Sequence, residues 1–291
     1  MLRTTFPVMS HTLPDGLSLA REKESVLIAW LSSQPSVLLG FSGGVDSAYL
    51  GCVSVDSMGS GRVLAVIGRS ASYPAEQWAV ARKVASQFGL AVLEIDTNEM
   101  LDPRYVSNPG NRCYFCKTEL WTQLSAVASE RAISTIIDGT NADDLGEHRP
   151  GMKAAREHGI RSPLAEVGLT KAEIRLLSQT RGIPTWAQPS SPCLASRIPH
   201  GIAVTPMRLE QVERAERALR SLGITGDLRV RHHGELARVE LAAGELDFWL
   251  SPANLRAMRT VIRGAGFTRV AVDMRGYRSG SLNILDRISA A

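Results

Sequence analysis

Few cysteines, few aromatic residues and no long apolar run set the first limits on this sequence. Only four of its 291 residues are cysteine, and 5% are aromatic. A membrane-spanning helix needs about 20 consecutive apolar residues, and Gly, Ser or charged residues interrupt the apolar stretches well before that length. Four unevenly spaced cysteines are too few for a secreted scaffold held by disulfides. We therefore expect no membrane partner, reduced thiols and a cytoplasmic location.

The remaining composition is that of an ordinary globular protein. Hydrophobic residues make up 44% and charged residues 21%. The net charge of +4 is too small to indicate a nucleic-acid-binding surface, so nucleic acid is not an expected partner. Residues 1–20 lack an apolar segment followed by a small-residue cleavage site. We expect a loose leader there rather than a secretion signal.

Between residues 36 and 140, short apolar segments alternate with a helical pattern. The segments 36–41, 63–68, 91–96 and 134–140 have the length and composition of buried parallel strands. A helix is expected between the second and third, because one helical face carries Trp78, Ala81, Val84, Ala85 and Phe88, and Gly89 follows where it would end. Strand, helix and strand in this order predict a doubly wound α/β fold with a parallel sheet.

A boundary between two domains is expected near residue 186. Thr170 and Glu173 have the spacing of a capping box, which predicts a helix that ends near Gly182. The segment 183–201 then holds four prolines, as a linker or long loop would. We therefore expect a first domain over residues 21–186 and a second over residues 187–291.

The second domain is predicted to be a smaller α+β unit. Thr205 and Ser251 are each followed by proline, the pattern of an N-cap and a first helical residue. Two strands joined by a turn at Gly234 are expected over 228–241, and a last strand over 268–274.

The turn after the first predicted strand has the composition of a phosphate-binding loop. A turn of this kind before a helix aims backbone N–H groups and the helix dipole at one anion. A carboxylate among phosphate ligands is useful mainly for holding Mg²⁺, which we assign to Asp46. A turn that merely uses glycines is the alternative, and it leaves Asp46 unexplained. The expected loop residues are Ser42, Gly43, Gly44, Val45, Asp46 and Ser47.

A second polar segment follows the fourth predicted strand. Open α/β sheets bind ligands at the carboxyl ends of their strands, so Asn141, Asp143 and Asp144 are expected to orient ribose or Mg²⁺. An Asx-rich turn is the alternative for each of them. Arg149 follows closely and is expected to meet a phosphate.

Together these motifs resemble a known family. The sequence SGGVDS at 42–47 resembles the signature of the ATP pyrophosphatases, and further segments make the chain similar to the LarE family of ATP-dependent sulfur insertases over nearly its whole length beyond the leader. The resemblance implies that ATP is split to AMP and pyrophosphate, that a substrate carboxylate becomes an adenylate, and that sulfur then replaces an oxygen. The segments are NPGNRCYFCK at 108–117, DGTNADD at 138–144, RPG at 149–151, SPCLASRIPHG at 191–201 and RVRHHGELARVE at 229–240.

The resemblance assigns the sulfur chemistry to Cys193, because the cysteine of this segment is the sulfur donor in LarE-like proteins. Arg197 lies four residues further on in a proline-rich loop, where a cation can stabilise a thiolate, and it is expected at the ligand site. The alternative for Cys193 is a small buried hydrophobic residue, the usual fate of a free cysteine. Cys52, on the helix behind the phosphate loop, is expected in the core.

Three of the cysteines also suit an iron–sulfur site. Cys113 and Cys116 form a C-x-x-C pair, and with Cys193 they offer three thiolates for a [4Fe–4S] cube whose fourth iron stays open. Some LarE-like proteins resemble this arrangement, which implies a transferable sulfide on the open iron and catalytic turnover. A zinc site, a redox disulfide and two unrelated thiols are the alternatives.

Arg229 and Arg231 point to the same face of a predicted strand. The resemblance places them on a phosphate of substrate or AMP, for which guanidinium groups are suited. A solvated strand face is the alternative. His232 is expected at the surface, and Glu216 on a solvated helical face.

The resemblance further implies a homo-oligomer and a small carboxylate substrate, a pyridinium dicarboxylate mononucleotide on the way to a nickel-pincer cofactor. Two other functions compete with this one. The first is a tRNA-thiolating or amidating PP-loop synthetase, against which the modest net charge counts. The second is a protein that senses nucleotides or an iron–sulfur cluster without turnover.

Overall fold

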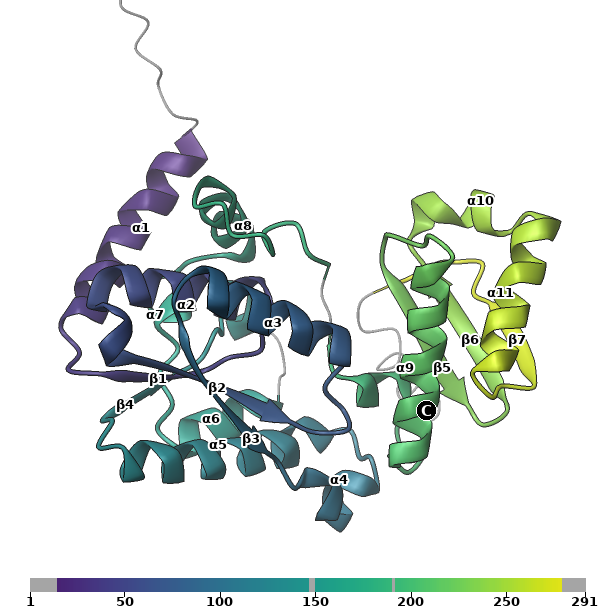
Figure 1. The fold of residues 1–291 in the computed structure, drawn as a ribbon, viewed down its shortest axis with the longest axis horizontal. Helices are drawn as coiled ribbons and strands as arrows, with labels where there is room; N and C mark the ends of the chain where they lie inside the picture. The colour runs from purple at the N-terminus through teal and green to yellow at the C-terminus, as the bar shows by residue number, and fades with distance from the viewer. Residues whose placement is uncertain (1–14, 147–149, 190–191, 279–291) are drawn as a thin grey trace, which may run out of the picture.

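The structure, a computed structural model, describes residues 15–146, 150–189 and 192–278, which form two domains (Figure 1). The larger, N-terminal domain contains a four-stranded parallel sheet in the order β3-β2-β1-β4. All four strands match the expected segments, so the parallel α/β fold is confirmed. The strands are β1 (Val37–Gly40), β2 (Val63–Arg69), β3 (Ala91–Asp96) and β4 (Thr135–Ile137).

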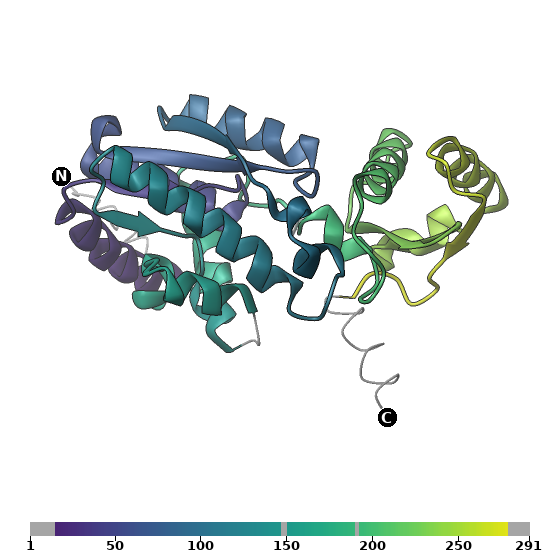
Figure 2. The same ribbon diagram turned by 90° about the horizontal axis from the view of Figure 1, so that it is seen from below.

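Helices cover both faces of this sheet, as the two views in Figures 1 and 2 show. Leu39 faces a core shared with α1 (Asp15–Ser32), α2 (Val45–Met58), α3 (Ala75–Gln87) and α8 (Lys171–Thr180). Leu38, one residue earlier in the strand, faces the opposite core with α5 (Arg112–Glu130) and α6 (Pro150–Glu157). α1 was not expected from the sequence, and a helix with Cys113 and Cys116 at its start, like α5, was only one of the alternatives for these thiols. Because α1 begins at Asp15, the last part of the expected 1–20 leader belongs to a helix.

The helical signals in the first domain were correct. In α3, Ala81, Val84 and Ala85 are buried, and Gly89 follows the helix with a φ of 65°. The capping box of α8 is present, since Thr170 accepts a hydrogen bond from Glu173 N and the Glu173 side chain accepts one from Thr170 N. The domain also contains α4 (Pro103–Val106), α7 (Pro163–Glu166), and the 3-10 turns η1 (Ser60–Arg62), η2 (Glu99–Leu101) and η3 (Ala142–Gly146).

The smaller domain packs helices against a mixed sheet of order β5-β6-β7. The turn at Gly234 makes β5 and β6 antiparallel, as expected, and β7 runs parallel to β6. Thr205 caps the first helix by accepting a hydrogen bond from Arg208 N. The elements are η4 (Leu194–Arg197), α9 (Pro206–Ser221), β5 (Leu228–His233), β6 (Leu236–Leu241), η5 (Ala243–Glu245), α10 (Leu246–Trp249), α11 (Pro252–Gly264) and β7 (Arg269–Val272).

Backbone hydrogen bonds join the two domains. Leu194 N donates to Ser72 O over 2.8 Å, and Val204 N donates to Val106 O over 2.9 Å. Ile183 belongs to the first core and Leu194 to the second, so the expected boundary near residue 186 falls between them. Within the described ranges, none of the helices combines the length and apolar character that a membrane crossing needs.

Gly43→Ala should cost more stability than Gly89→Ala. Both glycines have φ near 65°, where an added side chain costs roughly 1–2 kcal/mol. A Cβ at Gly43 would also lie 2.4 Å from the Cβ of Ala81, whereas nothing lies within 4 Å of one at Gly89. The unfolding temperature should therefore fall clearly more for Gly43→Ala than for Gly89→Ala. An equal fall in both variants would mean that α3 does not pack tightly against this turn.

Candidate functional site

The turn between β1 and α2 has the geometry of an anion site. α2 begins at Val45, and its N-cap residue Gly44 is extended and has no side chain to cap the helix. The hydroxyl groups of Ser42 and Ser47 lie 3.1 Å apart beside this helix start, and Ser42 Oγ accepts the N–H of Gly44 over 3.4 Å. A Cβ at Gly139, after β4, would lie 2.9 Å from Ser47 N, so the end of β4 packs directly on the helix start. The expected phosphate loop therefore lies at the carboxyl edge of the sheet.

Asp46 is the charged group of this turn. Its Oδ2 lies 2.5 Å from Lys171 Nζ, and its Oδ1 is buried without a hydrogen-bond partner among the described residues. Burial raises the pKa of Asp46, Lys171 opposes this, and Asp144 adds to it. A buried carboxylate oxygen that lacks a partner beside an anion site fits a hard cation such as Mg²⁺.

Lys171 is a candidate site residue that the motifs did not reveal. It is the first residue of α8, directly after the capping Thr170. Its ammonium group reaches Asp46 across 125 residues of chain. The capping box predicted where the helix begins, but only the packing of α8 on α2 brings this lysine to the phosphate loop.

The segment after β4 folds into a tight polar turn. Asn141 Oδ1 accepts a hydrogen bond from Asp143 N, and Asp144 Oδ2 accepts one from Asn141 N. Asp143 Oδ2 accepts the backbone N–H of Lys171 over 2.8 Å. These bonds are those of the Asx-rich turn considered as the alternative, and the turn also holds Asp144 close enough to raise the pKa of Asp46. Arg149 lies outside the described residues.

The structure brings Cys113, Cys116 and Cys193 together. Cys113 is exposed and Cys116 is half-buried; partial loss of hydration raises the pKa of both thiols, and the nearby Cys193 thiol raises both further. In the described part of the chain, no three His, Cys, Asp or Glu side chains surround a single metal ion. Three thiols in one region are the donors that a [4Fe–4S] cluster would need. Cys52 lies in the core, as expected, where burial raises its pKa to about 12.

The cation that faces the thiols is Arg112 rather than Arg197. Burial alone would lower the pKa of Arg112, but the thiols of Cys193 and Cys113 raise it. Arg197 instead forms a two-pronged ion pair with Glu216, at 2.8 and 2.9 Å, and donates to the carbonyl of Cys193. The expectation that Arg197 acts on the Cys193 thiolate therefore gives way to a role in holding the backbone of this loop, because its donors are already engaged.

Arg229 and Arg231 are buried, with exposed fractions of 3% and 5%. The solvated strand face is therefore wrong for both. Arg231 pairs with Glu240 and donates to Ser196 O over 2.9 Å. Arg229 stacks over the ring of Tyr277 at 4.7 Å, and burial together with the nearby Arg197 lowers its pKa. Guanidinium groups that lie this close together favour the binding of an anion beside them.

Two other surface assignments were wrong. His232 is buried, and its Nε2 lies 3.1 Å from Gln211 Oε1. Glu216 does not lie on a solvated face, since it accepts hydrogen bonds from Arg197 and from Val230 N. The local sequence pattern could not show either contact, because Gln211 and Arg197 belong to other elements than the residues they contact.

Consecutive residues after β2 connect the phosphate loop to the thiols. Tyr73 donates its hydroxyl proton to Ser42 O over 2.9 Å. The preceding Ser72 accepts the N–H of Leu194, the residue after Cys193. These two contacts hold the segment that carries Cys193 near the candidate phosphate loop.

Several known proteins are similar to this chain. Residues 29–107 match the NAD synthase family. The pyridinium-3,5-bisthiocarboxylic acid mononucleotide synthase of Lactiplantibacillus plantarum is 32% identical over 261 residues, which cover 90% of this chain and 94% of that protein. An uncharacterized protein of Synechocystis is 42% identical over 246 residues, 84% of this chain and 91% of that protein. One of Methanocaldococcus jannaschii is 26% identical, again over 84% of this chain and 91% of its own length.

Asp46→Asn should abolish pyrophosphate release without destabilising the protein. An acid whose pKa is higher in the folded than in the unfolded state weakens folding once the pH exceeds its unfolded value, so ionised Asp46 lowers stability at neutral pH. The variant should unfold at the same or a higher temperature at pH 7. Any gain should shrink as the pH falls toward the ordinary Asp pKa of about 3.9 and vanish well below it, where the carboxyl group is protonated in both states.

The matched control for this variant is Asp56→Asn, on the same helix but paired with Arg181. It should release pyrophosphate normally. If Asp46→Asn also did so, Asp46 would not hold the metal ion of the reaction.

Proposed function

This chain belongs to the LarE family of ATP-dependent sulfur transferases, and from that premise we propose that it converts a carboxylate of a pyridinium dicarboxylate mononucleotide to a thiocarboxylate. Nickel-pincer cofactor synthesis is then the pathway that it serves. The observation that carries the proposal is the connection of Cys193 to the phosphate loop through Ser72 and Tyr73. A thiol beside an adenylating loop has the chemistry of sulfur transfer to an activated carbonyl.

Adenylation is the first step. The α2 N-terminus and the hydroxyl groups of Ser42 and Ser47 bind the phosphates of ATP. Asp46 would hold Mg²⁺, which would supply positive charge to stabilise the departing pyrophosphate. A carboxylate oxygen of the substrate bonds to the α-phosphorus, the bond from that phosphorus to pyrophosphate breaks, and an acyl-adenylate remains. Lys171, which pairs with Asp46, is well situated to meet the negative charge of the phosphates.

Sulfur transfer follows from Cys193. Its thiolate attacks the activated carbonyl, AMP leaves with the electron pair of the broken C–O bond, and a thioester joins substrate to protein. Loss of the Cα proton and cleavage of the Cβ–S bond then release the thiocarboxylate and leave dehydroalanine at position 193. Arg112 lies where it can stabilise the thiolate before attack. The enzyme is consumed in this route.

An iron–sulfur route is the second source of sulfur. Cys113, Cys116 and Cys193 would hold a [4Fe–4S] cluster, which supplies a transferable sulfide at its open iron. The three thiols and the Arg112 cation share one region, as this route needs. Cys193 would then remain intact, and turnover would be catalytic.

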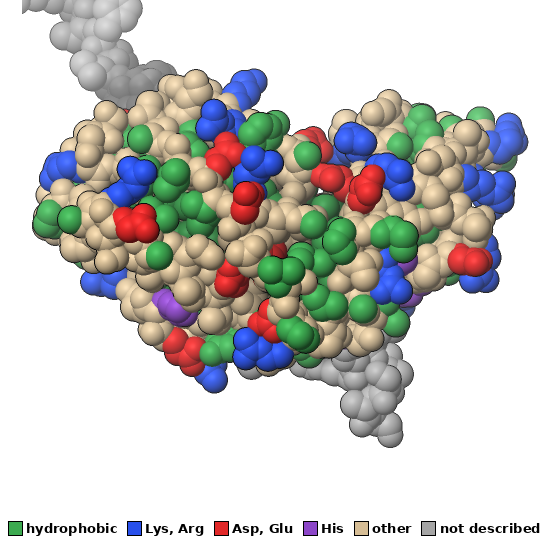
Figure 3. Space-filling model, turned by 60° about the horizontal axis from the view of Figure 1, so that its bottom comes forward, with side chains coloured by type: hydrophobic (Ala, Val, Ile, Leu, Met, Phe, Trp, Pro, Cys, Tyr) green, Lys and Arg blue, Asp and Glu red, His purple; other side chains and the backbone are tan. Residues whose placement is uncertain are grey.

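A homo-oligomer and a cytoplasmic location belong to the same proposal. On the face in Figure 3, hydrophobic side chains gather where the two domains meet. Leu101 and Met207 are large apolar side chains with exposed fractions of 79% and 71%. Exposed apolar surface of this kind is found at protein–protein contacts.

The mass of the protein after reaction distinguishes the two sulfur sources. If Cys193 is the donor, intact-mass spectrometry after incubation with ATP, Mg²⁺ and substrate should show the loss of one H₂S. Peptide mapping should then locate this loss at position 193. An unchanged mass with thiolated product would support the cluster. Cys193→Ala should still exchange labelled pyrophosphate into ATP with substrate present, because adenylation precedes sulfur transfer, and it should form no thiocarboxylate.

Two results would contradict the proposed function. If the wild-type protein exchanged no pyrophosphate with any carboxylate, it would be a sensor rather than an enzyme. If Cys193→Ala formed thiolated product at the wild-type rate, the sulfur would come from elsewhere.

Anaerobic reconstitution tests the cluster directly. Wild-type protein should bind four irons and show a brown chromophore, and Cys113→Ala or Cys116→Ala should lose both. Cys52→Ala is the matched control and should keep both, because Cys52 lies in a separate core. Absence of iron from the wild-type protein would leave Cys193 as the donor.

A further inference from the structure

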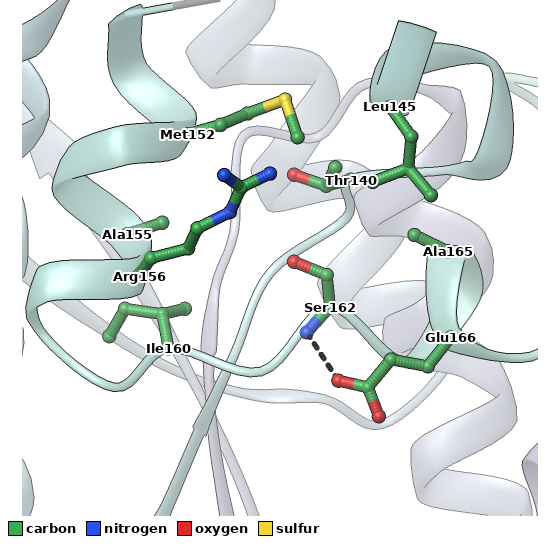
Figure 4. A pocket seen from close by; sticks show the side chains of 9 residues that line it. All are labelled: Thr140, Leu145, Met152, Ala155, Arg156, Ile160, Ser162, Ala165 and Glu166. Atoms are coloured by element: carbon green, nitrogen blue, oxygen red, sulfur yellow. Dashed lines mark hydrogen bonds between the residues drawn. The ribbon is translucent and has the colours of Figure 1, made fainter.

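A cavity of about 230 Å³ lies between α6 and α7, beside the end of β4 (Figure 4). None of the residues that line it belongs to the phosphate loop or the thiol site. Ligand pockets for drug-sized molecules usually measure about 300–1,000 Å³, so this cavity suits a smaller occupant. The lining residues are Thr140, Leu145, Met152, Ala155, Arg156, Ile160, Ser162, Ala165 and Glu166.

Apolar side chains form most of the wall. Met152 and Ala155 come from α6, Ile160 from the loop that follows, and Ala165 from α7. Leu145 stands opposite, and its exposed fraction of 54% is high for a leucine. Ala155, Ile160 and Ala165 are already buried, so an apolar ligand would mainly cover Leu145 and the half-buried Met152, which is favourable at about 25 cal/mol per Å² of surface removed from water.

Arg156 is the charged group of the cavity that has no counter-ion among the described residues, and its side chain is exposed at the mouth of the cavity. Figure 4 shows its guanidinium group directed toward the hydroxyl groups of Thr140 and Ser162. Both hydroxyl groups donate their protons to Asp138, over 2.9 and 2.8 Å. No acceptor lies within hydrogen-bond distance of Arg156 in the ranges that the structure describes.

Glu166 is the carboxylate among the residues that line the cavity, and it is already paired. Glu166 accepts hydrogen bonds from Arg161 at 2.9 and 2.5 Å and from Ser162 N at 3.2 Å. It therefore does not neutralise Arg156, and the cavity presents one cation against apolar walls.

We propose that this cavity binds a small monocarboxylate with an apolar body, such as a single aromatic ring. The carboxylate pairs with Arg156, and the ring covers Leu145, Met152 and Ile160. A phosphate fits less well, because one guanidinium group and apolar walls leave most of its oxygens without donors. The site lies next to the nucleotide site, since Thr140 precedes Asn141, and its occupant would contact the segment that holds Asp144 near Asp46.

Calorimetric titration with benzoate, with benzamide as its neutral counterpart, tests the proposal. Benzoate should bind at millimolar concentration or better, and benzamide at least roughly tenfold more weakly, since a charge-assisted hydrogen bond accounts for that ratio. Arg156→Gln should weaken benzoate binding at least about tenfold. Arg131→Gln, which removes an exposed arginine at the end of α5, should leave it unchanged.

A second titration in saturating Mg²⁺ and ATP separates this cavity from the nucleotide site. Benzoate should still bind, and Arg156→Gln should still weaken it. Displacement of benzoate by ATP, equal binding of benzamide, no saturable binding at millimolar benzoate, or full affinity in a folded Arg156→Gln variant would each overturn the proposal.

Discussion

The contact between the Cys193 loop and the segment that follows β2 is the constraint on which the proposed site depends. Leu194 belongs to the core of the second domain, and its N–H donates to Ser72 in the first. Tyr73, next in sequence, donates to the phosphate loop at Ser42. Activation of a carboxylate and delivery of sulfur can succeed each other only if both groups reach one carbon atom. Two hydrogen bonds connect the segments that the proposed reaction needs to bring together.

Buried ion pairs fix the same loop from the side of the second domain. Arg197 pairs with Glu216 and donates to the carbonyl of Cys193, while Arg231 pairs with Glu240 and donates to Ser196 O. Removing one partner of a buried pair typically costs about 3–5 kcal/mol, because the other charge is left without compensation. Arg197 and Arg231, which the sequence predicted at the ligand site, therefore hold the segment of Cys193 in place.

Charge at the phosphate end is arranged differently. Asp46 is buried enough to have a raised pKa, yet one of its oxygens has no partner among the described residues, and the ammonium group of Lys171 neutralises the other. Such a carboxylate is costly in the empty protein and becomes favourable when a cation arrives. The charged carboxylate of Asp46 thus lowers the folding stability of the protein at the position where cation binding would need a preorganised negative charge.

The sequence by itself determined the four parallel strands, the glycine turn before α2, the capping box at Thr170 and the mixed second domain, since these depend on local periodicity and on residues near in the chain. It also singled out the three cysteines. Only the tertiary structure decided that Arg112 rather than Arg197 faces the thiols, that Lys171 reaches Asp46, that His232 is buried, and that Glu216 pairs with Arg197. Each of these outcomes depends on a partner from a distant element, and local pattern carries no information about which distant charge a side chain will meet.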